Sequence, residues 1–198
     1  IEKRLIDYVG GRKDIEDRIV RAIGDPVKRF TEDKLRVLRA VRFGARLGYT
    51  IEPATWNAVR IMAPEIHQVS KERIREELAR ILTEGQAAGG VRMMEESGLR
   101  AAIVPEVRWT ESLERALSMI RRGASADFAM AVLLHETPYP AAVAVVGRLR
   151  FSNAEALHVL DMVKQLPKFA DVRSIRVSAL KRFFRLDRFQ DHIGRAHV

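Results

Sequence analysis

Residues 31–43 read Thr31-Glu32-Asp33-Lys34-Leu35-Arg36-Val37-Leu38-Arg39-Ala40-Val41-Arg42-Phe43, and the interpretation of the whole chain starts from this stretch. Its pattern predicts one helix over about 31–47 that ends at Gly48. Thr31 can cap the first turn, where the helix dipole favours the carboxylates of Glu32 and Asp33. At about 100° per residue, the apolar side chains gather on one side of this helix. They are Val37, Leu38, Val41 and Ala45, with Leu35 near the margin.

The other side of the predicted helix carries one acid and three arginines. Asp33, Arg36 and Arg39 fall on that side, and Arg42 lies on its border. We call these four the selector residues. Such a row suits recognition of a ligand better than it suits solubility alone. The alternative is that Asp33 only favours the helix dipole, while Arg36 pairs with it on a solvated face.

The remaining periodic segments also predict helices. A short apolar segment ending at Gly10-Gly11 is typical of a strand end or a loop. Ser152-Asn153-Ala154-Glu155 is a capping-box pattern that opens a helix to about residue 166. The fold class is therefore all-α, preceded by a short non-helical segment. The other predicted helices cover about 14–23, 53–62, 86–97, 110–122 and 141–149, with three more starting at Ser70, Ser125 and Ser178. The helix from Ser125 carries the apolar stretch 128–134 and should be buried in the centre of the molecule.

The charge of the 198-residue chain is concentrated at its two ends. The net charge is +9 and the pI is about 10.3. Residues 1–50 carry thirteen Lys and Arg against eight Asp and Glu, and residues 172–198 carry seven against two, whereas the middle is close to neutral. This distribution indicates contact with a polyanion at the ends, or else ordinary solvated charge.

The composition also limits the cellular compartment and the class of protein. The chain has no cysteine, which excludes disulfides and thiolate metal sites and fits a reducing cytoplasm. No run of eighteen apolar residues occurs, so we expect no membrane span. Neither end of the chain has the pattern of a natural terminus, and we expect a piece of a longer protein. The oligomeric state stays open.

Several motifs carry a resemblance to a known family. They are Asp7-Tyr8-Val9-Gly10-Gly11-Arg12-Lys13-Asp14-Ile15, then Ile23-Gly24-Asp25-Pro26, then Arg29-Phe30 with the stretch 31–43, and finally Ser70-Lys71-Glu72-Arg73-Ile74-Arg75-Glu76-Glu77-Leu78. In this order and spacing they resemble the class II tRNA nucleotidyltransferase and bacterial poly(A) polymerase family. The resemblance is dense over residues 5–82, weaker to about Val107 and faint beyond.

The resemblance implies a domain organisation and a set of partners. Residues 1–26 would end an α/β nucleotidyltransferase head, 27–107 would form a helical neck that selects the nucleotide and binds RNA, and 108–198 would form a helical body. The partners implied are ATP, CTP and the 3′ end of tRNA or another RNA. By the family pattern, Asp33 and Arg36 read the incoming base, and Arg39 and Arg42 make further nucleotide contacts.

The chemistry of Asp33 and Arg36 supports that role independently. Cytosine and adenine each present an amine donor beside a ring-nitrogen acceptor, whereas uracil and guanine present the opposite order. An ionised carboxylate only accepts hydrogen bonds and a guanidinium only donates them. An Asp–Arg pair therefore complements C and A. Arg39 and Arg42 could reach sugar or phosphate oxygens.

The residues that catalyse nucleotidyl transfer are not found in this sequence. Such transfer uses paired carboxylates that hold two metal ions, and the family places them in an Asp-x-Asp of the head, a motif that does not occur here. Magnesium is thus expected only in the missing head. The chain is predicted to bind substrate without catalysing, with no metal site of its own. The carboxylates of Asp14-Ile15-Glu16-Asp17 are better explained as a helix start.

Two weaker features lie in the second half of the chain. His135-Glu136 resembles the His-Asp step of metal-dependent phosphohydrolases, but Glu replaces Asp, and a packed histidine is the better interpretation. The basic last segment could contact an RNA backbone. Two alternatives to the nucleotidyltransferase reading stay open: a noncatalytic helical RNA-binding module and a degenerate phosphohydrolase. The candidate RNA-binding residues of the last segment are Arg173, Arg176, Lys181, Arg182 and Arg185.

Overall fold

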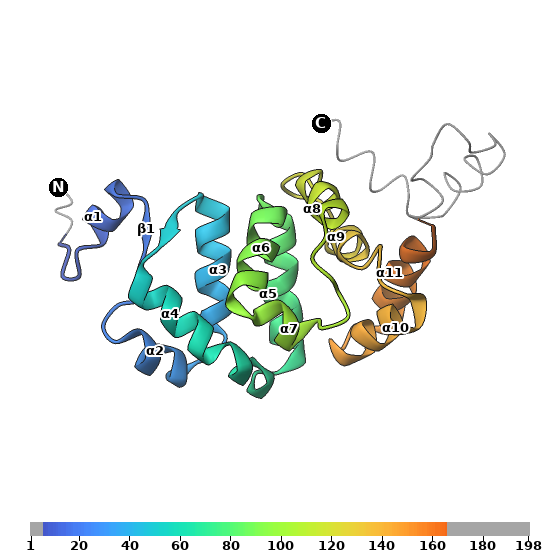
Figure 1. Cartoon of the computed structure of the whole chain (residues 1–198), viewed down its shortest axis with the longest axis horizontal. Helices are drawn as coiled ribbons and strands as arrows, with labels where there is room; N and C mark the ends of the chain where they lie inside the picture. The colour runs from blue at the N-terminus through green and yellow to red at the C-terminus, as the bar shows by residue number, and fades with distance from the viewer. Residues whose placement is uncertain (1–5, 166–198) are drawn as a thin grey trace, which may run out of the picture.

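The computed structural model describes residues 6–165, and in that part the chain is almost entirely helical. The helices lie side by side in an elongated row, with α1 at one end and α10 and α11 at the other (Figure 1). The elements in chain order are α1 Gly11–Glu16, β1 Ile19–Val20, α2 Pro26–Glu32, α3 Arg36–Leu47, β2 Thr50–Ile51, α4 Pro53–Met62, the 3₁₀ helix η1 Ala63–Gln68, α5 Lys71–Thr83, α6 Ala87–Ser97, α7 Leu99–Ile103, α8 Glu111–Ser118, α9 Ala126–Leu133, α10 Tyr139–Arg148 and α11 Asn153–Gln165.

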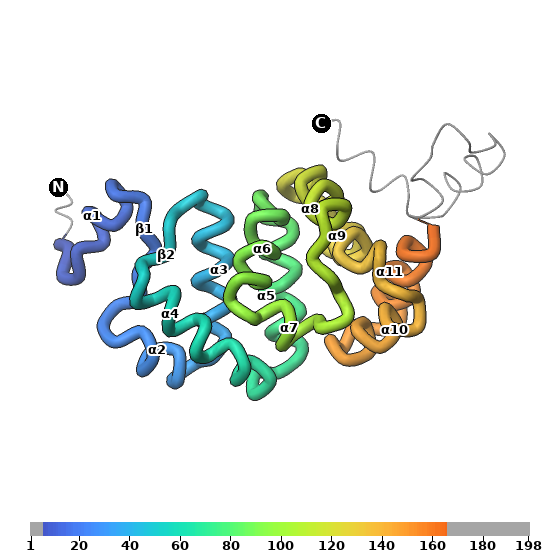
Figure 2. Tube along the Cα trace, in the orientation of Figure 1, coloured from blue at the N-terminus to red at the C-terminus, as the bar shows by residue number. Residues whose placement is uncertain are grey.

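The first segment corrects the helix predicted over 14–23. Helix α1 ends at Glu16, and Arg18 adopts a left-handed backbone with φ of 56°. The chain then extends into β1, which pairs in parallel with β2 so that Ile19 lies opposite Thr50. The apolar spacing of this segment suited a helix, but pairing with a strand some thirty residues later decides its conformation. Figure 2 shows β1 and β2 next to each other, beside α3.

The stretch 31–47 forms the end of one helix and the whole of another, which corrects the predicted single helix. Asp33 has extended backbone, with φ of −148° and ψ of 102°, between α2 and α3. Its carboxylate accepts a hydrogen bond from the backbone N–H of Leu35 at 3.2 Å, a local bond that competes with the helical ladder. Thr31 is not a cap, because it lies inside α2 and its hydroxyl donates to the carbonyl of Val27. The predicted end of α3 is confirmed, since Gly48 has φ of 64° and closes the helix.

Four of the later helices, α5, α8, α9 and α11, begin beside the serine or threonine at which the sequence predicted their start. The side chains of Ser70, Thr110 and Ser125 each accept a hydrogen bond from the backbone N–H three residues on. The capping box of α11 is complete, because Ser152 and Glu155 each receive the other's backbone N–H. These caps could be predicted from the sequence because each needs only neighbouring residues, although the cap predicted at Thr31 is wrong.

Two details of the second half differ from the prediction. Helix α8 ends at Ser118 rather than near residue 122, and the chain turns until the backbone N–H of Gly123 donates to the carbonyl of Thr83. The short helix α7 was not expected. The predicted last helix, from Ser178, lies outside the described residues.

One hydrophobic core runs from α2 to α11. It extends from Phe30 to Val163. Helix α3 packs against α5 and α6, and α5 also packs against α9. The predicted burial of α9 is confirmed, with Ala129 to Leu133 all buried. Among residues 6–165 no helix is long and apolar enough to cross a membrane.

Candidate functional site

Asp33 lies at the junction of α2 and α3 and is held by a residue from a distant part of the chain. One guanidinium nitrogen (Nη2) of Arg73, on α5, lies 3.2 Å from Oδ1 and 3.1 Å from Oδ2 of Asp33. The backbone N–H of Leu35 adds a third bond, to Oδ1. The Asp33 side chain retains 26% exposure, so the carboxylate is fixed and still reachable from solvent.

These contacts keep Asp33 ionised. Burial alone would raise the pKa of Asp33 above its ordinary 3.8. The hydrogen bonds from Arg73 and Leu35 and the positive charges of Arg73 and Arg39 outweigh burial, so the pKa lies below that value. At neutral pH the group is therefore a hydrogen-bond acceptor only.

Arg36 opens α3 and does not pair with Asp33, contrary to the solvated-pair alternative. Its Nη1 donates to Glu32 at 2.8 Å and to the backbone carbonyl of Arg29, also at 2.8 Å. Glu32 in addition accepts from the side chain of Arg29 at 2.6 Å. The Arg36 side chain is 31% exposed, and these bonds engage only one of its three nitrogens.

Arg39 and Arg42 differ sharply in accessibility. The Arg39 side chain is 45% exposed, and its nearest carboxylate, that of Glu77, is 4.0 Å away. The Arg42 side chain is only 8% exposed and donates to Glu77 at 2.6 Å and to Glu84 at 3.0 Å. Burial alone would lower the pKa of Arg42, but these two carboxylates outweigh it and raise the pKa. Arg42 was predicted to lie on the border of the polar face, and the structure places it inside the protein.

Helix α5 faces the selector residues with the complementary charges. Arg73 meets the acid Asp33, whereas Glu77, one turn later, meets the arginines Arg39 and Arg42. The sequence showed only a charged side on α5, and nothing local identified Arg73 or Glu77 as partners of the stretch 31–43. The structure brings Asp33, Arg36 and Arg39 to one partly exposed site. Arg42 is instead buried and pairs with Glu77, the carboxylate that also lies nearest to Arg39.

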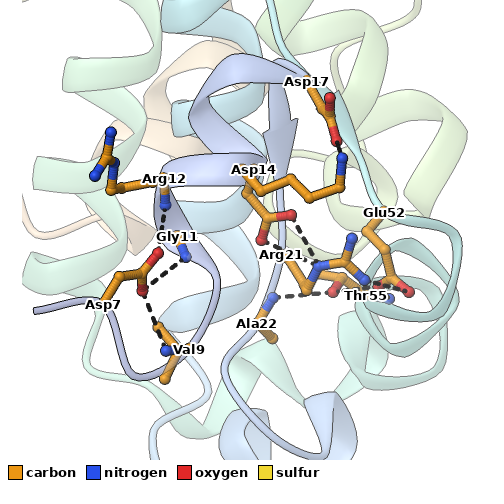
Figure 3. Close-up of polar contacts among 11 residues, drawn as sticks. Asp7, Val9, Gly11, Arg12, Asp14, Asp17, Arg21, Ala22, Glu52 and Thr55 are labelled. Atoms are coloured by element: carbon orange, nitrogen blue, oxygen red, sulfur yellow. Dashed lines mark hydrogen bonds and ion pairs between the residues drawn. The ribbon is translucent and has the colours of Figure 1, made fainter.

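The segment before α2 is built around two acids (Figure 3). Asp7 accepts backbone N–H bonds from Val9, Gly11 and Arg12 and so covers the start of α1. These bonds, with that of Arg12 the largest, lower the pKa of Asp7.

Asp14, in the first turn of α1, accepts from Nε of Arg21 at 3.1 and 3.2 Å, and Arg21 also lies 3.6 Å from Glu52 (Figure 3). Asp17 pairs with Lys13. Asp14 lies in the first turn of α1, but the stretch Asp14–Asp17 is not a helix start as predicted, because α1 begins at Gly11 and ends at Glu16. Within residues 6–165 no group of three His, Asp or Glu side chains could hold a metal ion.

An open hollow of 530 Å³ lies beside this segment, between α1, β1 and the outer side of α3. Apolar side chains such as Val9, Ile15, Phe43 and Leu47 line it. None of the four selector residues borders this hollow.

The His135-Glu136 pair has a structural explanation. Glu136 accepts from the hydroxyl of Thr110 at 2.6 Å, at the start of α8. Hydrogen bonds from Ser112 and Thr110 lower the pKa of Glu136. Nδ1 of His135 lies 2.7 Å from the carbonyl of Val132, one turn earlier. Glu136 thus joins α9 to α8. The candidate RNA-binding residues Arg173, Arg176, Lys181, Arg182 and Arg185 lie outside the described residues.

Known proteins match part of this chain in sequence. A family model described as the probable RNA and SrmB-binding site of polymerase A matches residues 48–110. The CCA-adding enzyme of Bacillus licheniformis is 44% identical over 88 residues, which is 44% of this chain and 22% of that enzyme. Poly(A) polymerase I of Escherichia coli O6:H1 is 37% identical over 101 residues, 51% of this chain and 22% of that protein. The chain thus spans about a fifth of the length of these curated relatives.

Solved structures share the fold over most of the chain. A tRNA-processing enzyme in an apo form superposes with a TM-score of 0.70 at 20% identity, covering 87% of this chain and 53% of that one. A CCA-adding enzyme in complex with CTP and the Thermotoga maritima CCA-adding enzyme in complex with tRNA each give 0.65 at 21% identity; they cover 85% and 84% of this chain, and 43% of each of those chains. The chain belongs to the class II CCA-adding enzyme and poly(A) polymerase family, in the region that matches its RNA-binding neck and body.

Proposed function

We propose that this chain is the nucleotide-selecting and RNA-binding part of a template-independent nucleotidyltransferase that adds C or A to the 3′ end of tRNA, or AMP to other RNA 3′ ends. The observation that carries this proposal is the geometry at the start of α3. Asp33 and Arg36 lie three residues apart, and both side chains are partly exposed. The two side chains do not bond each other, because Arg73 holds that of Asp33 and Glu32 holds that of Arg36.

This arrangement offers one hydrogen-bond acceptor and one hydrogen-bond donor to the planar edge of a base. Oδ2 of Asp33 receives a bond only from Arg73 among the described residues, so it can accept a second one. Arg36 is bound through Nη1, which leaves Nε and Nη2 to donate. A carboxylate beside a guanidinium matches the amine and ring nitrogen of C and A. With G or U, the carboxylate would face an acceptor and the guanidinium would face a donor. Polar groups left unpaired in this way cost about 1–3 kcal/mol each.

The family comparison supports the proposed partners. Related enzymes of this fold are described in complex with CTP, with ATP and with tRNA. By the same reasoning, residues 1–26 would be the end of the head, 27–107 the neck and 108–198 the body. The core that runs from Phe30 to Val163 would then join neck and body without a break in packing.

Catalysis is proposed to depend on residues that precede this chain in a longer protein. Nucleotidyl transfer of this class uses carboxylates that hold magnesium, and the 198 residues contain no Asp-x-Asp. The pure chain, given magnesium, ATP, CTP and tRNA, should therefore incorporate no nucleotide. Turnover by the pure chain would refute this part of the proposal.

The selection role is tested by Asp33→Ala in the nucleotidyltransferase that carries this chain. We expect the preference for CTP and ATP over UTP and GTP to fall by about tenfold or more, because the fixed acceptor is gone. The measurement is kcat/KM with each nucleotide separately, on tRNA lacking its terminal residues. Asp25→Ala is a matched control, since Asp25 also bonds a backbone N–H but caps α2. A preference that stays intact in Asp33→Ala would show that Asp33 does not read the base.

A noncatalytic RNA-binding module is the second candidate. The match of residues 48–110 to a family model for RNA binding favours it independently of the selector residues. An upstream coding sequence with an Asp-x-Asp would decide for the enzyme. tRNA binding by the chain, with no Asp-x-Asp in the complete protein, would decide for the module.

A further inference from the structure

Arg73 comes from a different helix than the selector residues and contacts only their acid. It lies 40 residues from Asp33 in sequence and approaches both oxygens of its carboxylate, at 3.1 and 3.2 Å. Among residues 6–165 the Arg73 side chain has no other hydrogen bond or ion pair. The Arg73 side chain is 48% exposed, so the contact is not forced by burial.

The contacts of Asp33 determine how its carboxylate is oriented. The backbone N–H of Leu35 holds Oδ1 from the α3 side, and Arg73 holds the carboxylate from the α5 side. A short side chain with two fixed directions has little rotational freedom left. Without Arg73, only the single bond from Leu35, at 3.2 Å, would restrain it.

Helix α5 holds the backbone of Arg73 in a defined position. The cap at Ser70 fixes its first turn, and the next residue after Arg73, Ile74, is 2% exposed. One turn after Arg73, Glu77 is 3% exposed and bonds Arg42 of α3. The position of Arg73 relative to α3 is thus set by a buried ion pair and by core packing.

We propose that Arg73 is a positioning residue for base selection, which holds the carboxylate of Asp33 in the orientation that accepts from the amine of C or A. This inference rests on the proposed function. It adds that the specificity of the site depends on α5, outside the stretch 31–43 that contacts the base. Asp33 keeps acceptor capacity on Oδ2 while it is held, so positioning and base reading are compatible.

A purely structural role for the Arg73–Asp33 pair predicts something different. An exposed ion pair contributes little to folding, and its loss would then affect all four nucleotides equally. A positioning role changes the ratio between nucleotides. It also predicts partial rescue by Arg73→Lys, which retains a positive donor but not the planar guanidinium.

The first test measures kcat/KM for CTP, ATP, UTP and GTP in the nucleotidyltransferase that carries this chain. We expect Arg73→Ala to lower the preference for CTP and ATP about fivefold to tenfold, and Arg73→Lys to restore part of it. Arg80→Ala is the matched control, because Arg80 is an exposed arginine of the same helix whose side chain has no hydrogen bond or ion pair in the described part of the chain. It should retain the wild-type preference.

The second test needs no nucleotide. The Asp33 carboxyl of the 198-residue chain is titrated by carbon-detected NMR. Arg73→Ala should raise the pKa of Asp33, because it removes a hydrogen bond and a nearby positive charge that both lower it. Arg80→Ala should not change it.

The outcomes separate this inference from the proposed function. If Asp33→Ala lowers the preference and Arg73→Ala does not, the positioning role is wrong while base reading by Asp33 stands. If neither variant changes the preference, base reading itself fails, and the inference fails with it. An unchanged titration of Asp33 in Arg73→Ala would also overturn the inference, because the contact would then be missing in solution.

Discussion

Replacing Arg42 by methionine should destabilise the protein strongly. Nε of Arg42 donates to Glu77 at 2.6 Å, and Nη1 donates to Glu84 at 3.0 Å. The Arg42 and Glu77 side chains are 8% and 3% exposed, so this pair is inside the protein. Methionine keeps most of the length of the side chain and removes its charge and donors, so it tests the ion pair more than the packing.

The expected loss of stability depends on the positively charged partners that Glu77 retains. After the change, the nearest positive group to Glu77 is Arg39, at 4.0 Å and 45% exposed. Removing one partner of a buried ion pair costs about 3–5 kcal/mol, because the other charge stays buried. Glu84 adds little, since it is 26% exposed and keeps Arg46 at 3.2 Å. We therefore expect a loss of about 3 kcal/mol, a large part of the about 5–15 kcal/mol that stabilises a typical domain.

The measurement is urea unfolding of the 198-residue chain at pH 7, followed by far-UV circular dichroism. Arg46→Met is the matched control, because Arg46 also pairs with Glu84 but its side chain is 38% exposed. It should cost about 1 kcal/mol or less. If Arg42→Met unfolds within about 1 kcal/mol of the wild type, the buried pair does not support the fold as its geometry indicates.

Two further predictions concern packing and pH. Gly90→Ala should destabilise the fold by about 1–3 kcal/mol, because its Cβ would lie 2.5 Å from Cγ2 of Ile81, whereas Gly89→Ala, with no atom within 4 Å, should raise stability by up to about 1 kcal/mol through helix propensity; thermal unfolding of both variants checks this, and an equal effect would contradict it. Hydrogen bonds and charge from Arg148 lower the pKa of Glu106 below its ordinary 4.5, so the stability from this pair is present above that pH and is lost as the pH falls through the lowered pKa. Glu106→Gln should therefore cost about 1 kcal/mol at pH 7 and progressively less below about pH 4.5 in urea unfolding, and a difference that stays constant with pH would argue against the pair.

Local signals in the sequence predicted much of the fold. Ser70, Ser125 and Ser152 mark helix starts because each cap needs only a backbone N–H three residues on. Gly48 marks a helix end for a similarly local reason, its left-handed backbone. The apolar spacing within α3 also predicted the buried side correctly, including Leu38 and Val41.

Features that depend on distant residues could not be predicted in this way. The helix over 31–47 was expected to be continuous, but it is interrupted at Asp33. The carboxylate of Asp33 accepts hydrogen bonds from the nearby backbone of Leu35 and from Arg73, 40 residues away. Helical spacing placed Arg42 on the border of a polar face, because the spacing does not show that Glu77 lies opposite it.

The roles of the selector residues come from the family resemblance and the chemistry of the bases, and they stay predictions. The structure adds their geometry: it fixes Asp33 and leaves Arg36 and Arg39 accessible. It also shows that Arg42 is buried and pairs with Glu77 and Glu84.

The most direct measurement of base selection is nucleotide preference after Asp33→Asn. Asparagine has nearly the same shape, but its amide can donate as well as accept, whereas the ionised carboxylate only accepts. Uracil and guanine present an acceptor where C and A present an amine. We predict that Asp33→Asn raises kcat/KM for UTP and GTP relative to CTP and ATP by about tenfold in the nucleotidyltransferase that carries this chain. An equal loss for all four nucleotides would contradict the assignment of Asp33 as the group that reads the base.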